Sequence, residues 1–354
     1  MTLGHADEVT GRLADMLYDY AQAEPLGLTS VYDDDLCHVT VTSVAPLPPA
    51  VPRLAADVLT QLRATIEHAV CAEVEAALDR ELTPEEARRV EMPATTTSDA
   101  FAEWLNRSKR KELPPLREGS DLVKRMRSLQ PYHRKDADQH PLRVLAEHTN
   151  LAKHRTPAVA AVQLALVHTW PLNNPEVLVG VRGTPLEVGT VLATGPKYKQ
   201  VPIDIWPQVA IRRPHTGEWM VIVKEIGALA EWVRTVAIPV IVTGEANAEP
   251  PLPPQIDTTR GWASERDALQ AGGAIPADLR HLTRLQAHTA RRDLPEILAL
   301  HPEPPEPAVI QQWVDGLTDD QVLTQINTFS RHDPLVRAEA ARTMIRKAQE
   351  AYEQ

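Results

Sequence analysis

The chain has few of the residues on which several common kinds of site depend. Among its 354 residues there are only two cysteines, Cys37 and Cys71, and they form no Cys-x-x-Cys pair. Neither a disulfide scaffold nor a thiolate zinc site is therefore expected. Aromatic residues make up only 4% of the chain. The core must therefore be built mainly from Leu, Val, Ile and Ala.

Complete catalytic and cofactor motifs are also missing. The sequence has no glycine-rich phosphate loop in a strand–helix context and no Gly-x-Ser-x-Gly nucleophile elbow. His133, His140, His148 and His154 match no standard zinc spacing. We therefore expect neither a metal nor a cofactor.

No part of the chain predicts a membrane protein. The N-terminal residues do not resemble a signal peptide, and we find no run of about 18 apolar residues that predicts a membrane span. Hydrophobic residues make up 43% of the chain, as in globular proteins. A cytoplasmic protein without a membrane partner is the expectation.

The charge is negative overall but unevenly distributed. The formal net charge of -11 argues against a surface that binds nucleic acid throughout. Residues 107–135, however, contain ten basic and three acidic residues. Two interpretations remain open for this segment: a solvated charge run, or part of an RNA-binding or phosphate-binding edge over residues 107–155.

The spacing of apolar residues predicts an α+β fold. Helical spacing predicts helices over residues 54–78 and 141–156, whereas residues 37–44 and short β-branched segments after residue 158 predict strands. We expect a helical segment packed with a mainly antiparallel β-sheet or small barrel, followed by a C-terminal helical module. The expected parts are an α+β core over 1–244 (helical 46–156, β-rich 158–244), a proline-rich linker over 245–275, and the helical module over 276–354.

The helix expected to begin at Pro141 carries a polar stripe. Helical spacing places Arg143, Glu147, Asn150 and His154 on one face. In a catalytic interpretation, His154 transfers protons with Glu147 as its partner, while basic and amide side chains hold an anion. The ligand-binding residues would be Arg143, Asn150, Lys153 and Arg155. In the alternative, Arg143 and Glu147 form an ordinary i, i+4 ion pair, and the basic residues complement the helix dipole.

A second candidate lies on the long helix over residues 54–78. Arg63 and His68 have the spacing Arg-x4-His, which resembles the motif of the HEPN superfamily. That resemblance implies a metal-independent ribonuclease or phosphate-binding protein, in a bacterial defence or toxin setting, with Arg63 on the phosphate and His68 in proton transfer. A regular helix, however, places the two side chains about 140° apart. The alternative is a surface His68 beside an Arg63–Glu67 ion pair.

The two helices together resemble a family of uncharacterised, mainly actinobacterial proteins. The resemblance covers about residues 31–244 and lies in four segments: Asp57–His68, Gln130–Tyr132, His140–Asn150 and Lys153–Arg155. The chain departs from the family at Gln61, where Asn is usual, at Glu67, where Asp is usual, and at Ala152, where an acid is usual. The family implies a fold and the location of a site, but no activity.

Two functional hypotheses of different classes follow. In the first, Arg63 and His68 act with Glu147, Asn150, Lys153 and His154 across a helix pair, as a HEPN-like ribonuclease or phosphate-ligand protein. In the second, the protein is a non-catalytic scaffold, the polar stripe holds two helices together, and residues 276–354 bind a protein partner. An ordinary small core is the simpler explanation of the apolar residues in the C-terminal helices.

Overall fold

A computed structural model describes residues 1–107, 112–154, 160–169, 176–180, 183–197, 203–329 and 334–352, without the side chains at 153, 154, 165–169, 203, 204 and 334. The fold is α+β, as predicted. The described strands pair in an antiparallel manner and form two open sheets, not a barrel. The contacts divide the chain into two compact units, Met1–Asp278 (unit 1) and Leu279–Gln354 (unit 2).

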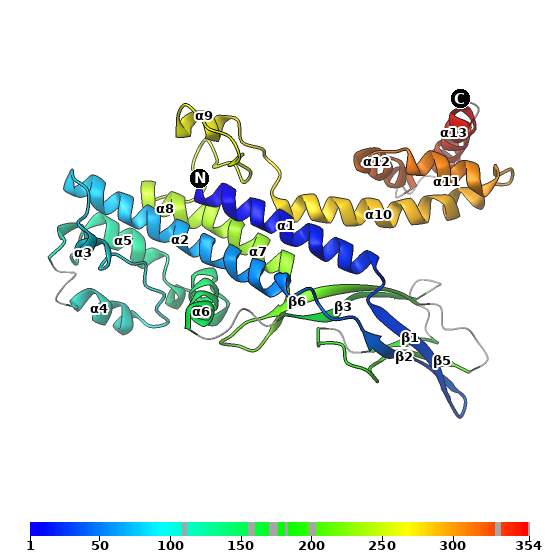
Figure 1. The fold of residues 1–354 in the computed structure, drawn as a ribbon, viewed down its shortest axis with the longest axis horizontal. Coiled ribbons are helices and arrows are strands. Elements are labelled where there is room, and N and C mark those ends of the chain that lie inside the picture. The colour runs from blue at the N-terminus through cyan, green and yellow to red at the C-terminus, as the bar shows by residue number, and fades with distance from the viewer. Residues whose placement is uncertain are drawn as a thin grey trace. The chain divides into compact units, whose positions relative to one another are not determined.

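A long buried helix, α2 (Ala50–Leu78), forms the centre of unit 1 (Figure 1). Leu62, Ile66 and Val70 recur at helical spacing and are fully buried. The N-terminal helix α1 (Thr2–Gln22) packs along α2 through its own apolar residues. The helix ends at Asp79, which adopts the left-handed conformation with φ 53°.

Two further helices cover other sides of α2. Helix α6 (Pro141–His154) begins with a proline, whose fixed φ suits the first helical position, and it buries Leu142 and Leu145 in the same core. Helix α7 (Ile222–Trp232) continues through a π-helical turn (Val233–Ala237) into α8 (Ile238–Thr243). Both α7 and α8 pack on α2.

The stretch Ile222–Thr243 corrects one expectation from the sequence. It is long and apolar enough to cross a membrane by length and composition, whereas the sequence was expected to contain no such run. A core helix meets the same criterion, and Ile226, Val233 and Ile241 are fully buried in the core of unit 1. We therefore describe it as a core helix of unit 1.

Three shorter helices begin at hydroxyl caps. Helices α3 (Pro84–Ala87), α4 (Ser98–Asn106) and α5 (Asp121–Ser128) are preceded by Thr83, Thr97 and Ser120. Each capping oxygen accepts a hydrogen bond from the backbone N–H three residues later. Such caps satisfy backbone donors that have no partner inside the helix.

The strands form two sheets next to the helices (Figure 1). One sheet has the order β1-β2-β5-β4 and the other β3-β6-β7. Buried side chains from both sheets, including Val41, Val162, Leu164 and Leu192, form a second core cluster. The strands are β1 (Leu26–Asp33), β2 (Leu36–Val44), β3 (Ala160–Thr169), β4 (Leu178–Val179), β5 (Val191–Pro196), β6 (Ile203–Arg212) and β7 (Trp219–Val221).

The proline-rich segment expected to be a linker lies within unit 1. Ile256 is buried against Gly4 of α1, and the Thr258 hydroxyl donates a 2.6 Å hydrogen bond to the Glu8 carboxylate. The segment also contains a short helix, α9 (Glu265–Gln270). Residues 245–275 are therefore anchored to α1 by specific contacts.

Unit 2 is helical, as predicted for the C-terminal module. Helix α10 (Ala277–Ala299) begins in unit 1 and continues into unit 2, where α11 (Pro307–Asp315), α12 (Asp319–Phe329) and α13 (Pro334–Tyr352) follow. Unit 2 has its own apolar core, which includes Leu294, Leu298, Val314 and Ala348. Arg291 joins α10 to the start of α12 through a 2.6 Å ion pair with Asp319.

We expect Gly4→Ala to loosen the proline-rich segment from α1. A Cβ at position 4 would lie 2.7 Å from the Cβ of Ile256, an atom that cannot rotate away. The strain opposes a gain of about 1 kcal/mol in helix propensity. Limited proteolysis should cleave residues 245–275 faster in this variant than in the native chain. Gly261→Ala, where a Cβ meets open space, is the control, and equal cleavage of both variants would contradict the expectation.

Candidate functional site

Arg63 and Glu67 hold the loop before α4 onto α2. Their side chains form an ion pair of 2.5 Å. Arg63 donates to the carbonyl oxygen of Met92, while the Glu67 carboxylate accepts the backbone N–H of Met92 at 2.7 Å. Burial raises the pKa of Glu67, and the neighbouring Arg63 charge lowers it in part. Both polar backbone groups of one residue are thus satisfied by α2.

His68 lies apart from this contact. Its ring is exposed, and Nδ1 lies 3.3 Å from the Thr2 hydroxyl of α1. Arg63 and His68 therefore contact different segments of the chain, as their separation around a regular helix leads one to expect. The structure does not bring them together on one partner, and their joint catalytic role stays a prediction.

The polar stripe of α6 contains the ion pair that its spacing allows. Arg143 Nη1 lies 2.7 Å from the Glu147 carboxylate, and Arg143 Nε lies 3.7 Å from Asp138. Asn150, further along the helix, is exposed. The side chains of Lys153 and His154 and the whole of Arg155 lie outside the described residues. The predicted catalytic role of Glu147 with His154 is therefore untested.

Several cations of the basic segment are already paired. Arg125 bonds Glu73 of α2 at 3.1 Å and donates to the carbonyl oxygens of Ile241 and Val242 at the end of α8. Arg127 pairs with Glu118 at 2.6 Å, and Lys124 with Asp121 at 2.9 Å. Arg134 and Lys135 are exposed. Much of the positive charge in the described part of 107–135 thus serves local contacts.

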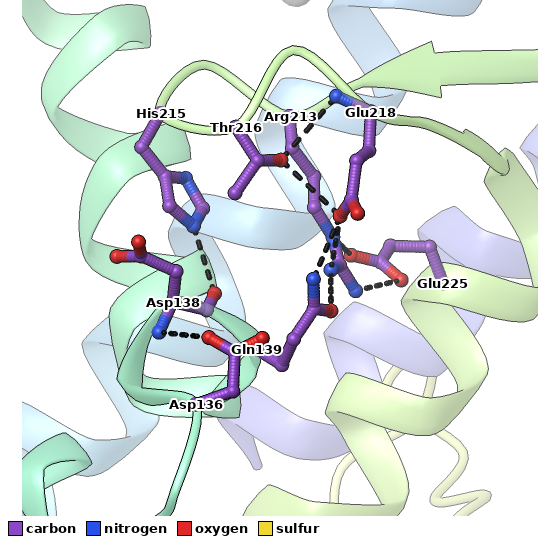
Figure 2. A network of polar contacts seen from close by, with 8 residues as sticks. All are labelled: Asp136, Asp138, Gln139, Arg213, His215, Thr216, Glu218 and Glu225. Atoms are coloured by element: carbon purple, nitrogen blue, oxygen red, sulfur yellow. Dashed lines mark hydrogen bonds and ion pairs between the residues drawn. The ribbon is translucent and has the colours of Figure 1, made fainter.

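A buried ion pair lies close to the start of α6 (Figure 2). Arg213, at the end of β6, bonds both carboxylate oxygens of Glu225 in α7, at 2.7 and 3.0 Å. Both side chains are buried. Such a two-point contact fixes the guanidinium and the carboxylate in one plane. The pair therefore ties the β6–β7 turn to α7.

The same guanidinium reaches the segment before α6. Arg213 donates to the Gln139 side chain and lies 3.3 Å from Glu218, and Gln139 in turn donates to Glu218 at 2.8 Å (Figure 2). The hydrogen bond from Gln139 and the charge of Arg213 hold the pKa of Glu218 below its usual value. Three chain segments, namely the residues before α6, the β6–β7 turn and α7, thus meet in one network.

Two histidines adjoin this network with ring nitrogens that have no hydrogen-bond partner among the described residues. His148 of α6 is 3% exposed, and both its Nδ1 and Nε2 are unpartnered. His215 donates from Nε2 to the Asp138 carbonyl oxygen at 2.9 Å, and its Nδ1 is unpartnered. Burial lowers the pKa of His148 to about 4, with smaller contributions from His215 and Arg213. His148 is therefore neutral at neutral pH.

His140 is a second buried, neutral imidazole. Burial lowers its pKa to about 4, and the charges of Arg134 and His133 add to this. Its Nδ1 accepts the backbone N–H of Leu142 at 3.1 Å, and its ring packs edge-on against Trp232. This histidine caps the start of α6, whereas His148 has no such structural bond.

The cluster around Arg213 can take up a proton on His148 below neutral pH. Its hydrogen bonds also hold the segment before α6, the β6–β7 turn and α7 together. Within the described residues, no three His, Cys, Asp or Glu side chains are grouped so that they could hold a metal ion. Both carboxylate oxygens of Glu225 are occupied by Arg213. The charged groups of the cluster are thus paired with one another. The ring nitrogens of His148 and Nδ1 of His215 are the buried polar atoms that this pairing leaves without a partner among the described residues.

Sequence reasoning missed the centre of this network. Arg213, His215, Glu218 and Glu225 were not candidates, and His148 was considered only as a metal ligand. One signal was present: Arg212-Arg213-Pro214-His215 interrupts two apolar strand segments. A turn sequence alone does not reveal that Arg213 is buried, because burial depends on α6 and α7 folding over it.

No protein-family model, no curated protein and no solved structure matches the chain. Both family resemblances therefore stay predictions, and function has to be inferred from the geometry.

We expect Glu225→Gln to destabilise unit 1 by about 3–5 kcal/mol, because it leaves the buried Arg213 charge without its partner. The double variant Arg213→Met/Glu225→Leu should cost clearly less than the sum of Arg213→Met and Glu225→Leu measured separately. Chemical denaturation of the native chain, the two single variants Arg213→Met and Glu225→Leu, and the double variant measures this coupling. Strict additivity would contradict a cooperative buried pair.

Stability should also fall in mild acid. His148 has a pKa of about 4 in the folded chain against 6.5 ordinarily, so the unfolded chain binds a proton that the folded chain excludes. The free energy of unfolding therefore decreases as pH falls from 6.5 towards 4, by at most about 3 kcal/mol for this residue. His148→Leu should flatten in part the profile measured by denaturation at each pH, because His140, whose pKa is also lowered to about 4, keeps its own contribution. His5→Gln, on exposed α1 surface, should leave it unchanged; equal profiles for both variants would exclude His148 as a cause.

Proposed function

We propose that this protein is a non-catalytic, cytoplasmic interaction protein, in which unit 1 is a stable α+β platform and unit 2 binds a protein partner. The observation that carries the proposal is the position of Arg63. Its guanidinium is engaged by Glu67 and Met92, while His68 contacts α1. A phosphate-cleaving pair has to converge on one group, and these two side chains have separate partners.

Unit 2 supplies the supporting observation for a partner. It has an apolar core of its own, yet Leu279 and Leu282, one turn apart on α10, are exposed. Exposed leucines that recur on one helix face are typical of surfaces that bind another protein. An ordinary solvent-facing surface remains the simpler alternative.

A second candidate is phosphate-ligand or RNA binding through residues 107–155. The specific observation in its favour is that Arg134 and Lys135 are exposed shortly before α6, on which Asn150 is also exposed. Such side chains would contact phosphates without sequence preference. The paired state of Arg125 and Arg127 reduces the charge available for this role.

A ribonuclease assay separates these functions. Labelled single-stranded RNA is incubated with the native chain and with His68→Ala/His154→Ala, in EDTA, and cleavage and fluorescence anisotropy are recorded. We expect neither protein to cleave RNA above buffer, because no described pair of acid–base groups faces a common phosphate. Cleavage by the native chain that the double variant loses would overturn the proposal. Salt-dependent binding without cleavage would favour the second candidate.

Partner binding is tested on the α10 surface. Proteins captured by the native chain from its own cell extract are compared with those captured by Leu279→Lys/Leu282→Lys and by the control Leu300→Lys. We expect at least one captured protein to be lost with the double variant alone, since a charge would be buried on binding. An identical set for all three chains would contradict a partner site on α10.

A further inference from the structure

Strand β1 forms an unprotected edge of the four-stranded sheet. Among the described strands, β1 pairs only with β2, so the other side of its backbone has no partner strand. Natural edge strands are usually short, bulged, or marked by lysine or proline. Over eight residues, β1 contains no lysine and no proline, and its one charged residue is Asp33. Its single irregularity lies at Gly27/Leu28, near its start.

The hairpin geometry determines which backbone groups face outward. The pair Asp33–Leu36 closes a two-residue turn, so these two residues share backbone hydrogen bonds, and the ladder alternates from there. The N–H and C=O groups of Thr29, Val31 and Asp33 therefore point towards β2. Those of Leu28, Ser30 and Tyr32 point away, to the free edge.

Three apolar side chains along this edge, Leu28, Val31 and Tyr32, are exposed, and they lie on both faces of the strand. Leu28 and Tyr32 share the face of Val41 and Cys37, and they are 39% and 60% exposed. Val31 lies on the opposite face and is 46% exposed. Most antiparallel strands bury one face, so an edge strand with apolar residues exposed on both faces is a strong candidate for pairing.

The outer face of the sheet also exposes single apolar side chains on each of its four strands, with polar residues such as His38 and Thr40 between them. The registers place Val31 of β1 on the same face as Leu36, Val191 and Leu178, and all four side chains are exposed. The hairpin β1–β2 extends away from the helices of unit 1 (Figure 1). The edge is thus exposed over residues 28–33 of β1.

We propose that two copies of this chain associate through their β1 strands, antiparallel and with a two-fold axis at Ser30. In this register Ser30 lies opposite Ser30 of the partner subunit, and Leu28 lies opposite Tyr32 of the partner subunit. Thr29 lies opposite the partner's Val31. The outward backbone groups of Leu28, Ser30 and Tyr32 become hydrogen-bonded pairs, and the two sheets join into one.

The sequence of β1 favours a second copy over an unrelated extended peptide. Cross-strand pairs of an aromatic with an aliphatic residue, and of two β-branched residues, stabilise antiparallel strands, and β1 supplies both kinds of pair to itself. The antiparallel register places Asp33 opposite Gly27 of the partner subunit. The acidic turns Asp33–Asp35 then lie about 20 Å apart, at six residues of about 3.3 Å, and do not repel each other strongly.

The same contact limits the assembly to a dimer. The two-fold pairing uses the β1 edge of each copy once and closes. The opposite edge, β4, has only two residues among the described strands, too few for a comparable ladder. The self-association is independent of whether unit 2 binds another protein, because it involves neither α10 nor any predicted catalytic residue.

The test is the molar mass of the full chain in solution, measured by light scattering over a concentration series. We expect the native chain to reach twice the monomer mass. Ser30→Pro removes the N–H at the two-fold axis from both copies but no hydrogen bond to β2, so the dissociation constant should rise about thirtyfold or more. Leu178→Lys, on the opposite edge, should dimerise like the native chain. A native chain that stays monomeric at every concentration would overturn the proposal.

Cross-linking keeps the test decisive if Ser30→Pro fails to fold. In a Cys71→Ser background, Ser30→Cys should form a covalent dimer with a short bismaleimide, because the two side chains face each other at the axis. Asp33→Cys should not, because its two copies lie about 20 Å apart. Equal cross-linking of both variants, or none with Ser30→Cys, would contradict this register. A dimer that Ser30→Pro leaves intact would place the contact elsewhere.

Discussion

The fold of unit 1 depends on one constraint: the apolar side of α2 has to be buried along its whole length. Val51, Leu62 and Val74 span about six turns of helix and are fully buried, so no single neighbour can cover them. Helices α1, α6, α7 and α8 each cover a part. The polar residues of α2 then lie at the edges of the apolar stripe, where they meet the segments that cross it. Glu67 binds the loop before α4, and Glu73 binds Arg125 of α5.

This arrangement explains why Arg63, which has the spacing of a catalytic residue, instead holds a neighbouring loop against α2. Arg63 flanks Leu62 on the helix and is close enough to the core to bond a buried loop. A guanidinium that satisfies a backbone carbonyl and a carboxylate at once has little freedom to bind a phosphate. The i, i+4 spacing of Arg63–Glu67 and of Arg143–Glu147 predicted both ion pairs from the sequence. What spacing could not predict was that Glu67 would also hold Met92, twenty-five residues later.

Sequence patterns that repeat within one helix predicted that helix correctly. Contacts between residues far apart in the sequence could not be predicted from such patterns. The stripe through Leu59, Leu62 and Ile66 predicted α2, and Pro141 marked the first residue of α6. Strand β1 was missed because its exposed side chains show no alternation. The network around Arg213 was missed for a different reason. It joins Gln139, Arg213 and Glu225 from three segments, and no local pattern shows that a charged side chain will be enclosed. Removing a guanidinium from water is costly, so the bidentate contact with Glu225 specifies the packing of the β6–β7 turn on α7 more than it stabilises it.

Exposed large apolar side chains are distributed unevenly over the chain. Between residues 37 and 177, no large hydrophobic side chain of the described residues is exposed. The described surfaces of α2 and α6, which carry the predicted catalytic residues, therefore expose no large apolar side chain to water. Exposed leucines, valines and tyrosines occur instead on the four-stranded sheet, in unit 2, and at a few other places in unit 1, namely Val188, Val242 and Leu269. A surface evolved for RNA would show the opposite pattern, with unpaired cations concentrated on α5 and α6, yet Lys124, Arg125 and Arg127 are paired with acids. The proposed contacts with other protein chains, at the sheet edge and at unit 2, would cover the exposed side chains at those two places.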